Sequence, residues 1–219
     1  METKDKFYLS ENEKKSWEEA PIILHYSQIR LFFEKGLELL SNIHNHKFTL
    51  SNKAIKIISL EEMATRKSKP CAGLCICTVS PMKIYLVEDK PLLVLEHLSH
   101  EYGHTEGRVL EESLLEEVKA FAFQKSFSLR FSEMGINETE LNIHRVKYSG
   151  RYGSVLHDQA VGILNNLKDN FDSASLPFAY FNLFKELAYN NKINTENDLI
   201  RFLGPSKNKF QEEAYKCQK

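Results

Sequence analysis

The sequence predicts an α+β fold, in which helices flank a small twisted sheet. Apolar residues recur at helical spacing in segment 22–43 and again from residue 91 onward, whereas they alternate with a period of two between residues 54 and 88. No repeat or low-complexity stretch interrupts this pattern. The expected order is therefore a helix, a small sheet, and then helices.

This order divides the chain into three expected parts. Residues 1–45 should form a polar N-terminal segment and a helix, and residues 46–134 should form the core that contains the sheet. Residues 135–219 should form an all-helical C-terminal subdomain. At 219 residues, the chain is long enough to bury a sizeable hydrophobic core.

The strands have clear signals. Residues 54–60 are predicted to form one strand, because apolar and polar side chains alternate there. Residues 73–80 and 83–88 are predicted to form a hairpin with its turn at residues 80–82. The first strand of the hairpin is the expected edge strand, with Cys75 and Cys77 on one face and Leu74, Ile76 and Thr78 on the other.

Helix signals follow the hairpin. Asp89 can cap a helix and Pro91 is tolerated in its first turn, while Gly107 is a plausible stop. A second helix is expected at residues 113–131, apolar on most of its surface and therefore buried. Further helical patterns, the last of them with a cap at Asn194 or Thr195, cover residues 153–169, 177–189 and 194–204.

Composition limits the classes of function. The net charge of −1, with acidic and basic residues mixed, gives no reason to expect a nucleic acid or an anionic membrane as a partner. Apolar runs are only a few residues long, far short of a membrane span. The charged N-terminus lacks an apolar core typical of a signal peptide, and the four cysteines are expected to be reduced. We therefore expect a cytoplasmic protein.

A short stretch, HEYGH at residues 100–104, has the spacing of a zinc-hydrolase motif. On a helix, His100 and His104 lie on one face, and Glu101 lies between them. Two neutral imidazoles can then bind zinc while the carboxylate acts as general base without binding the metal. His97 shares the face of His100, and we expect it to be a supporting, substrate-facing or structural residue.

A catalytic zinc normally has three protein ligands and one open position. The metzincin pattern would require a histidine at position 110, where the chain has Leu110, so that pattern is excluded. The other common solution is a glutamate from the next helix. Four carboxylates are available there: Glu111, Glu112, Glu116 and Glu117.

Glu117 is the favoured third ligand. Ser113 and Glu116 fit a capping box, in which Glu116 would satisfy the start of the helix. Glu117 instead heads a stripe that includes Ala120, which is small enough to let the two helices approach closely. Glu116 is the second candidate, and solvated carboxylates stabilised by the helix dipole are the remaining alternative.

The combination of HEYGH and EVKAFAF resembles the H-E-x-x-H … E-x-x-x-F-A arrangement of the ImmA/IrrE-like metallopeptidases and, more broadly, of the gluzincins, including the archaeal minigluzincins. The resemblance covers residues 54–131. It implies that Glu117 is the third zinc ligand, with Phe121 and Ala122 at the F-A positions. It also implies a zincin-like core whose substrate lies along an edge strand.

Two positions depart from the family pattern. Lys119 stands where the family commonly has asparagine, and Glu106 stands where zincins usually have an apolar residue. The expected function is a zinc metallopeptidase that cleaves a peptide or protein substrate, with Glu101 as the general base. The alternatives are a metal-binding regulatory or partner-binding protein of the same fold with little proteolysis, and a helical interaction protein with an accidental motif.

Hydrolysis also needs a donor to the developing oxyanion. Tyr152 and His157 are the candidates assigned to this role, and Tyr148 and His144 lie in the same segment. Each of these side chains can instead have an ordinary structural role. The oligomeric state is left open by the sequence.

The cysteines are expected to be buried thiols. Cys71, Cys75 and Cys77 do not have a standard zinc spacing. A thiol that reaches the metal as an inhibitory ligand is the alternative.

Overall fold

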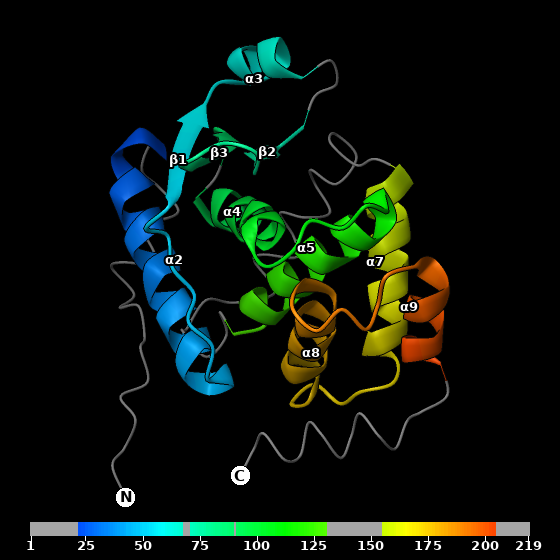
Figure 1. Cartoon of the computed structure of the whole chain (residues 1–219). Helices are drawn as coiled ribbons and strands as arrows, with labels where there is room; N and C mark the ends of the chain where they lie inside the picture. Colours follow the sequence, from blue (N-terminus) through cyan, green and yellow to red (C-terminus); the bar gives the residue numbers. More distant parts are fainter. Residues whose placement is uncertain (1–21, 68–70, 90, 131–154, 205–219) are drawn as a thin grey trace, which may run out of the picture.

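The computed structural model describes residues 22–67, 71–89, 91–130 and 155–204. These residues form an α+β fold of seven helices and one three-stranded sheet (Figure 1), so the predicted class is confirmed. In chain order the elements are α2 (Ile22–His44), β1 (Lys53–Ile58), α3 (Leu60–Arg66), β2 (Gly73–Ile76), β3 (Met82–Val87), α4 (Pro91–Thr105), α5 (Ser113–Ser128), α7 (Val155–Lys168), α8 (Leu176–Ala188) and α9 (Glu196–Leu203).

The sheet has the strand order β1-β3-β2, with β1 parallel and β2 antiparallel to β3. The predicted hairpin is therefore confirmed, and β2 is an edge strand. It is shorter than expected, because pairing ends at Ile76 opposite Lys83 and the chain turns at Cys77. The helix α3 was not predicted. It begins after Ser59, whose side chain accepts a hydrogen bond from the backbone N–H of Glu62.

The sheet lies between α3 and α4 (Figure 1). On the α3 side, Leu74 and Ile76 of β2 pack against the buried side chains of Met63 and Tyr85. Alternation along the strand directs the other face of β2 toward α4. The residues of that face include Gly73 and Cys75.

The helices α4 and α5 make an unusually close approach. A Cβ atom added to Gly103 would lie 2.8 Å from the Cα atom of Ala120 and 3.2 Å from the Cβ atom of Phe123. The expectation that Ala120 permits close packing is met, and Gly103 has the same role on the facing helix. This contact holds the two helices that carry the predicted metal ligands at a short distance.

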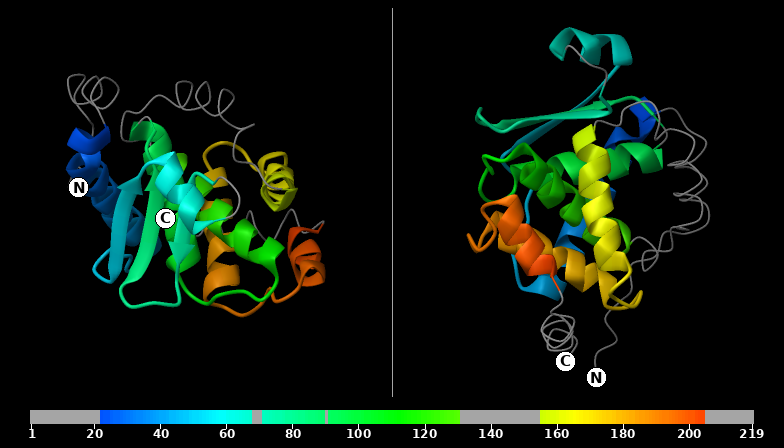
Figure 2. Two further views of the ribbon diagram at one scale, coloured as in Figure 1. Left: turned by 90° about the horizontal axis from the view of Figure 1, so that it is seen from above. Right: turned by 90° about the vertical axis from the view of Figure 1, so that its right-hand side faces the viewer.

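The other helices pack around this pair. The helices α2 and α7 lie on opposite sides of α4 and α5 (Figure 2), and α8 packs against α5. One hydrophobic cluster extends through them, including Phe33 of α2, Leu164 of α7 and Phe184 of α8. None of the helices in the described ranges has the length and apolar character needed to cross a membrane.

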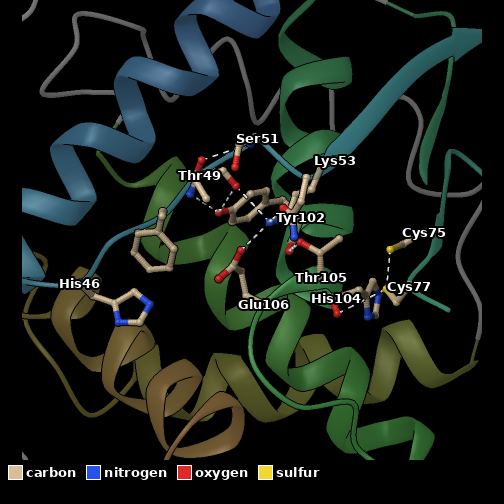
Figure 3. A network of polar contacts seen from close by, with 12 residues as sticks. His46, Thr49, Ser51, Lys53, Cys75, Cys77, Tyr102, His104, Thr105 and Glu106 are labelled. Carbon is tan, nitrogen blue, oxygen red and sulfur yellow. Dashed lines mark hydrogen bonds and ion pairs between the residues drawn. The ribbon is translucent and has the colours of Figure 1, made fainter. Parts of the chain in front are cut away.

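A polar network secures the C-terminal end of α4 (Figure 3). Lys53 donates to Glu106 Oε1 at 2.9 Å, and the hydroxyl of Tyr189 donates to Glu106 Oε2 at 2.9 Å. The hydroxyl of Tyr102 accepts from the backbone N–H of Thr49 at 3.1 Å. The network explains why a carboxylate is tolerated at position 106, since the buried Lys53 ammonium pairs with it.

The helix α4 ends at Thr105, and Gly107 then adopts a φ angle of +66°, as expected for a glycine that stops a helix. A Cβ atom at this position would also meet the backbone of Ala188, so glycine is required on two grounds.

Candidate metal centre

The first two predicted ligands lie one helical turn apart on α4. The Nε2 atoms of His100 and His104 are 3.3 Å from each other, and the two rings are nearly perpendicular, at 87°. His100 is buried, and His104 is nearly so. The helical spacing therefore produces the side-by-side imidazoles that the motif predicts.

The third predicted ligand approaches from α5. Glu117 Oε2 lies 3.3 Å from His100 Nε2 and 3.8 Å from His104 Nε2. Ligand atoms around a zinc ion bound at about 2.0 to 2.2 Å lie about 3.3 to 3.6 Å apart in a tetrahedron. The three separations are thus close to those of a tetrahedral metal site.

A fourth group joins this cluster from α7. His157 Nε2 lies 3.2 Å from Glu117 Oε2, and its ring centroid is 5.6 Å from that of His100. The ligand atoms of His100, Glu117 and His157 lie within 4.8 Å of one another, so this group can hold a metal ion. The ligand atoms of His100, His104 and Glu117 also lie within this distance of one another. This second group of three possible ligands shares His100 and Glu117 with the first.

The unpaired atoms of the cluster also fit a cation. Glu117 Oε2 is buried, and the Nε2 atoms of His100 and His157 lie 3.3 Å and 3.2 Å from it. His104 Nδ1 lies 2.9 Å from Glu116 Oε1, and a proton on Nδ1 would leave the Nε2 lone pair facing the cluster. Lone pairs that converge in this way can hold a cation.

The role expected for Glu116 is wrong. The N-cap residue of α5 is Glu112 rather than Ser113, and among the described residues its side chain makes no capping hydrogen bond. Glu116 Oε1 instead contacts His104 Nδ1 at 2.9 Å, and Oε2 accepts from the backbone N–H of Leu110 at 2.9 Å. Glu116 therefore orients a candidate ligand, because the loop before α5 folds its carboxylate toward α4.

Lys119 completes this arrangement, and the sequence did not indicate its role. Its side chain is fully buried, with Nζ 2.9 Å from Glu116 Oε1 and 2.8 Å from the carbonyl oxygen of Arg108. A lysine on an otherwise apolar helix was the available signal, since a buried ammonium requires a partner.

The candidate general base lies beside the cluster. Glu101 is buried, and its burial raises the pKa of the carboxyl group. A Cβ atom added to Gly73 of β2 would lie 2.6 Å from Glu101 Cγ and 2.8 Å from Cδ. The carboxylate therefore packs on the edge strand at a position where the backbone carries no side chain.

The electrostatics of the ligand atoms follow from burial and mutual contact. Burial lowers the pKa of His100 to about 4, which keeps this imidazole neutral. Burial opposes protonation of His104, but the hydrogen bond with Glu116 and the nearby carboxylates raise its pKa overall. Burial opposes ionisation of Glu117, but contacts with His100 and His157 lower its pKa well below the ordinary value. The carboxylate is thus ionised at neutral pH.

The cluster opens into a cavity of about 670 Å³ between β2, α4, α5 and α7. Phe121 lines it and packs against His100, with ring centroids 4.3 Å apart. His97 also lines the cavity, and burial lowers the pKa of its ring, whose Nδ1 has no hydrogen-bond partner in the described ranges. The structure places His157 of the expected oxyanion donors here, while Tyr152, together with Tyr148 and His144, lies outside the described residues.

Comparison with known proteins finds no match to a protein-family model, a curated protein or a solved structure. The interpretation of this site therefore depends on its geometry and chemistry.

Proposed function

We propose that this protein is a zinc-dependent metallopeptidase, with zinc held by His100, His104 and Glu117 and with Glu101 as the general base. The observation that carries the proposal is the convergence of the three ligand atoms at separations of 3.3 to 3.8 Å. The buried carboxylate of Glu101 stands beside two of these ligands on the same helix.

The donor set supports zinc among the common metals. Two imidazoles and one carboxylate are typical ligands of catalytic zinc, whereas magnesium and calcium prefer oxygen donors alone. Zinc held here would polarise the scissile carbonyl and lower the pKa of a bound water.

Three residues of the chain have separate roles in the proposed hydrolysis. Glu101 accepts a proton from the attacking water and delivers it to the leaving amine, and its raised pKa suits a group that must both take and give a proton. Glu116 holds the ring of His104 in place through Nδ1. His157, whose Nε2 lies beside Glu117, is positioned to donate a hydrogen bond toward the cavity when Glu117 engages a metal.

A peptide segment is the proposed substrate. The cavity is large enough for several side chains, and its wall includes the edge strand β2. Apolar side chains such as Leu93, Phe121 and Val161 line it beside the carboxylates. An extended peptide with apolar side chains would match these surfaces.

One observation favours a second candidate function. His157 Nε2 is as close to Glu117 Oε2 as the motif histidines are, so it can occupy the fourth metal position. A zinc ion with four protein ligands is typical of structural sites, whereas catalysis requires an open position. With His157 as a ligand, the protein would be a metal-binding regulatory or partner-binding protein with little proteolysis.

Metal analysis and three variants separate these functions. We expect one zinc ion per chain by elemental analysis, and loss of that zinc in His100→Ala. Glu101→Gln should retain zinc and abolish hydrolysis of a mixed fluorogenic peptide library, while Glu61→Gln on the exposed surface of α3 serves as the matched control. A protein without stoichiometric zinc would refute both candidate functions.

His157→Ala distinguishes the peptidase from a metal-binding regulator in which His157 is the fourth zinc ligand. If His157 is a donor to substrate, the variant keeps its zinc affinity and loses peptide hydrolysis. If His157 is a fourth ligand, zinc affinity falls by more than about 100-fold, beyond the roughly 10- to 100-fold loss typical of a residue that only contacts a ligand. The second result, together with wild-type protein that binds zinc without cleaving the library, would replace the peptidase by the metal-binding regulator.

A further inference from the structure

Two cysteines stand together at the end of the edge strand. Cys75 is in β2, Cys77 is in the turn that follows it, and their sulfur atoms are 2.7 Å apart (Figure 3). Both thiols are free and partly buried, and both line the cavity. The Cys77 thiol also donates to the carbonyl oxygen of His104 at 3.6 Å.

The third described cysteine has different surroundings. Cys71 packs against the cluster on the α3 side of the sheet, which contains Met63 and Tyr85. Cys71 also lines the cavity, but the sulfur–sulfur contact in the described part of the chain is the one between Cys75 and Cys77.

We propose that Cys75 and Cys77 form a redox-active dithiol that reacts with small-molecule disulfides, such as oxidised glutathione, and closes to an intramolecular disulfide. The proposal concerns thiol chemistry and does not depend on metal binding or peptide hydrolysis.

The reaction proceeds by two thiol–disulfide exchanges. One cysteine sulfur, as the thiolate, attacks the S–S bond of the oxidant, so that a mixed disulfide forms and one small thiol leaves. The second cysteine then loses its proton, and its sulfur attacks the first cysteine sulfur and displaces the other small thiol. Two protein thiols are oxidised to one disulfide, the oxidant is reduced to two thiols, and the two protons pass to the leaving thiolates.

The geometry permits closure with little movement. The sulfur atoms need to approach by only about 0.7 Å to reach the bonded distance of about 2.05 Å. Pairing of β2 with β3 ends at Ile76, so the backbone of Cys77 lies beyond the paired register of the sheet. The backbone at Cys77 can therefore adjust while Cys75 keeps its register opposite Ile84.

The contact between the two sulfurs also predicts the course of the reaction. Because the second thiol is already beside the first, its attack on a mixed disulfide competes effectively with the arrival of a second oxidant molecule. Intramolecular closure should exceed stable mixed disulfide by at least about 10-fold.

A double variant, Cys71→Ser with Cys217→Ser, gives a direct test, because it leaves Cys75 and Cys77 as the only cysteines of the chain. The folded variant is treated with oxidised glutathione in the presence of a metal chelator, and its intact mass is then measured. We expect a product about 2 Da lighter, with both cysteines protected from a maleimide and released by a reductant. Stable glutathione adducts on both cysteines, or two thiols that remain free, would overturn the proposal.

Single-cysteine controls and the wild-type chain complete the test. In the same background, Cys75→Ser and Cys77→Ser should each form one stable glutathione adduct, since no second thiol can displace it. In the wild-type chain, tandem mass spectrometry should assign the bond to Cys75 and Cys77. A bond from either residue to Cys71 would contradict the arrangement of the thiols and overturn the proposal.

Discussion

The buried ion pair between Lys119 and Glu116 gives a quantitative test of the site's architecture. Lys119 has no exposed surface. Its Nζ atom contacts Oε1 of Glu116 and the carbonyl oxygen of Arg108. Loss of one partner from a buried ion pair typically costs about 3 to 5 kcal/mol, because it strands the other charge. Glu116 keeps its contacts with His104 and Leu110, so Lys119→Met should lower the free energy of unfolding by about 3 kcal/mol.

A double-mutant cycle isolates the interaction itself. Glu116→Gln alone leaves the Lys119 ammonium buried with weaker acceptors and should cost about 2 kcal/mol. The double variant removes both charges, so its cost should fall short of the sum by about 2 kcal/mol. The measurement is urea unfolding of the three variants and the wild type, followed by circular dichroism.

A matched control uses an exposed pair of the same kind. Lys56 and Glu62 form an ion pair at 3.2 Å on the surface, and Lys56→Met should leave the unfolding midpoint nearly unchanged. If the loss of stability in the double variant equals the sum of the two single losses to within about 0.5 kcal/mol, Lys119 and Glu116 do not interact and the predicted coupling is refuted.

Three further predictions concern other contacts. Gly103→Val should destabilise the fold by about 1 to 3 kcal/mol, because its side chain would push α4 away from Ala120; a thermal melt unchanged from wild type would contradict this close approach. Gly73→Ala should leave zinc binding intact but displace the Glu101 carboxylate, so peptide hydrolysis at saturating zinc should fall at least about 10-fold, and an unaltered rate would exclude this packing. Burial, with the charge of Arg130, lowers the pKa of His44 from 6.5 to about 3, so the folded state binds fewer protons than the unfolded state in this range. Stability should therefore fall as the pH drops from 6.5 toward 3, and His44→Phe should reduce that fall in urea titrations; equal slopes for the two proteins would refute the assignment.

Sequence patterns were sufficient for elements whose signals are local. The period-two segments became β1 and the β2–β3 hairpin, and the Asn194 or Thr195 cap was found at Thr195, which forms a capping box with Asp198. The helix α3 was missed because the seven residues from Leu60 to Arg66 are too few to show helical periodicity clearly. Its start depends on one hydrogen bond, which the side chain of Ser59 accepts from the backbone N–H of Glu62.

Within the candidate metal centre, the sequence alone determined which residues of one helix lie on the same face. Residues four apart share a helix face, so the proximity of His100 and His104 followed from their spacing. Glu117 was preferred because it heads a stripe that includes Ala120, and this inference also needed only the regular geometry of an α-helix. The second argument, a capping box formed by Ser113 and Glu116, was wrong because the N-cap residue of α5 is Glu112.

Only the tertiary structure decided which distant groups meet that face. His157 reaches Glu117 because α7 packs across α5, and Glu116 turns to His104 because the loop before α5 brings Leu110 within reach of its carboxylate. The contact between the Cys75 and Cys77 sulfurs likewise depends on where the sheet pairing ends. Such contacts depend on how separate elements pack against one another, and the spacing of residues along the chain does not specify that packing.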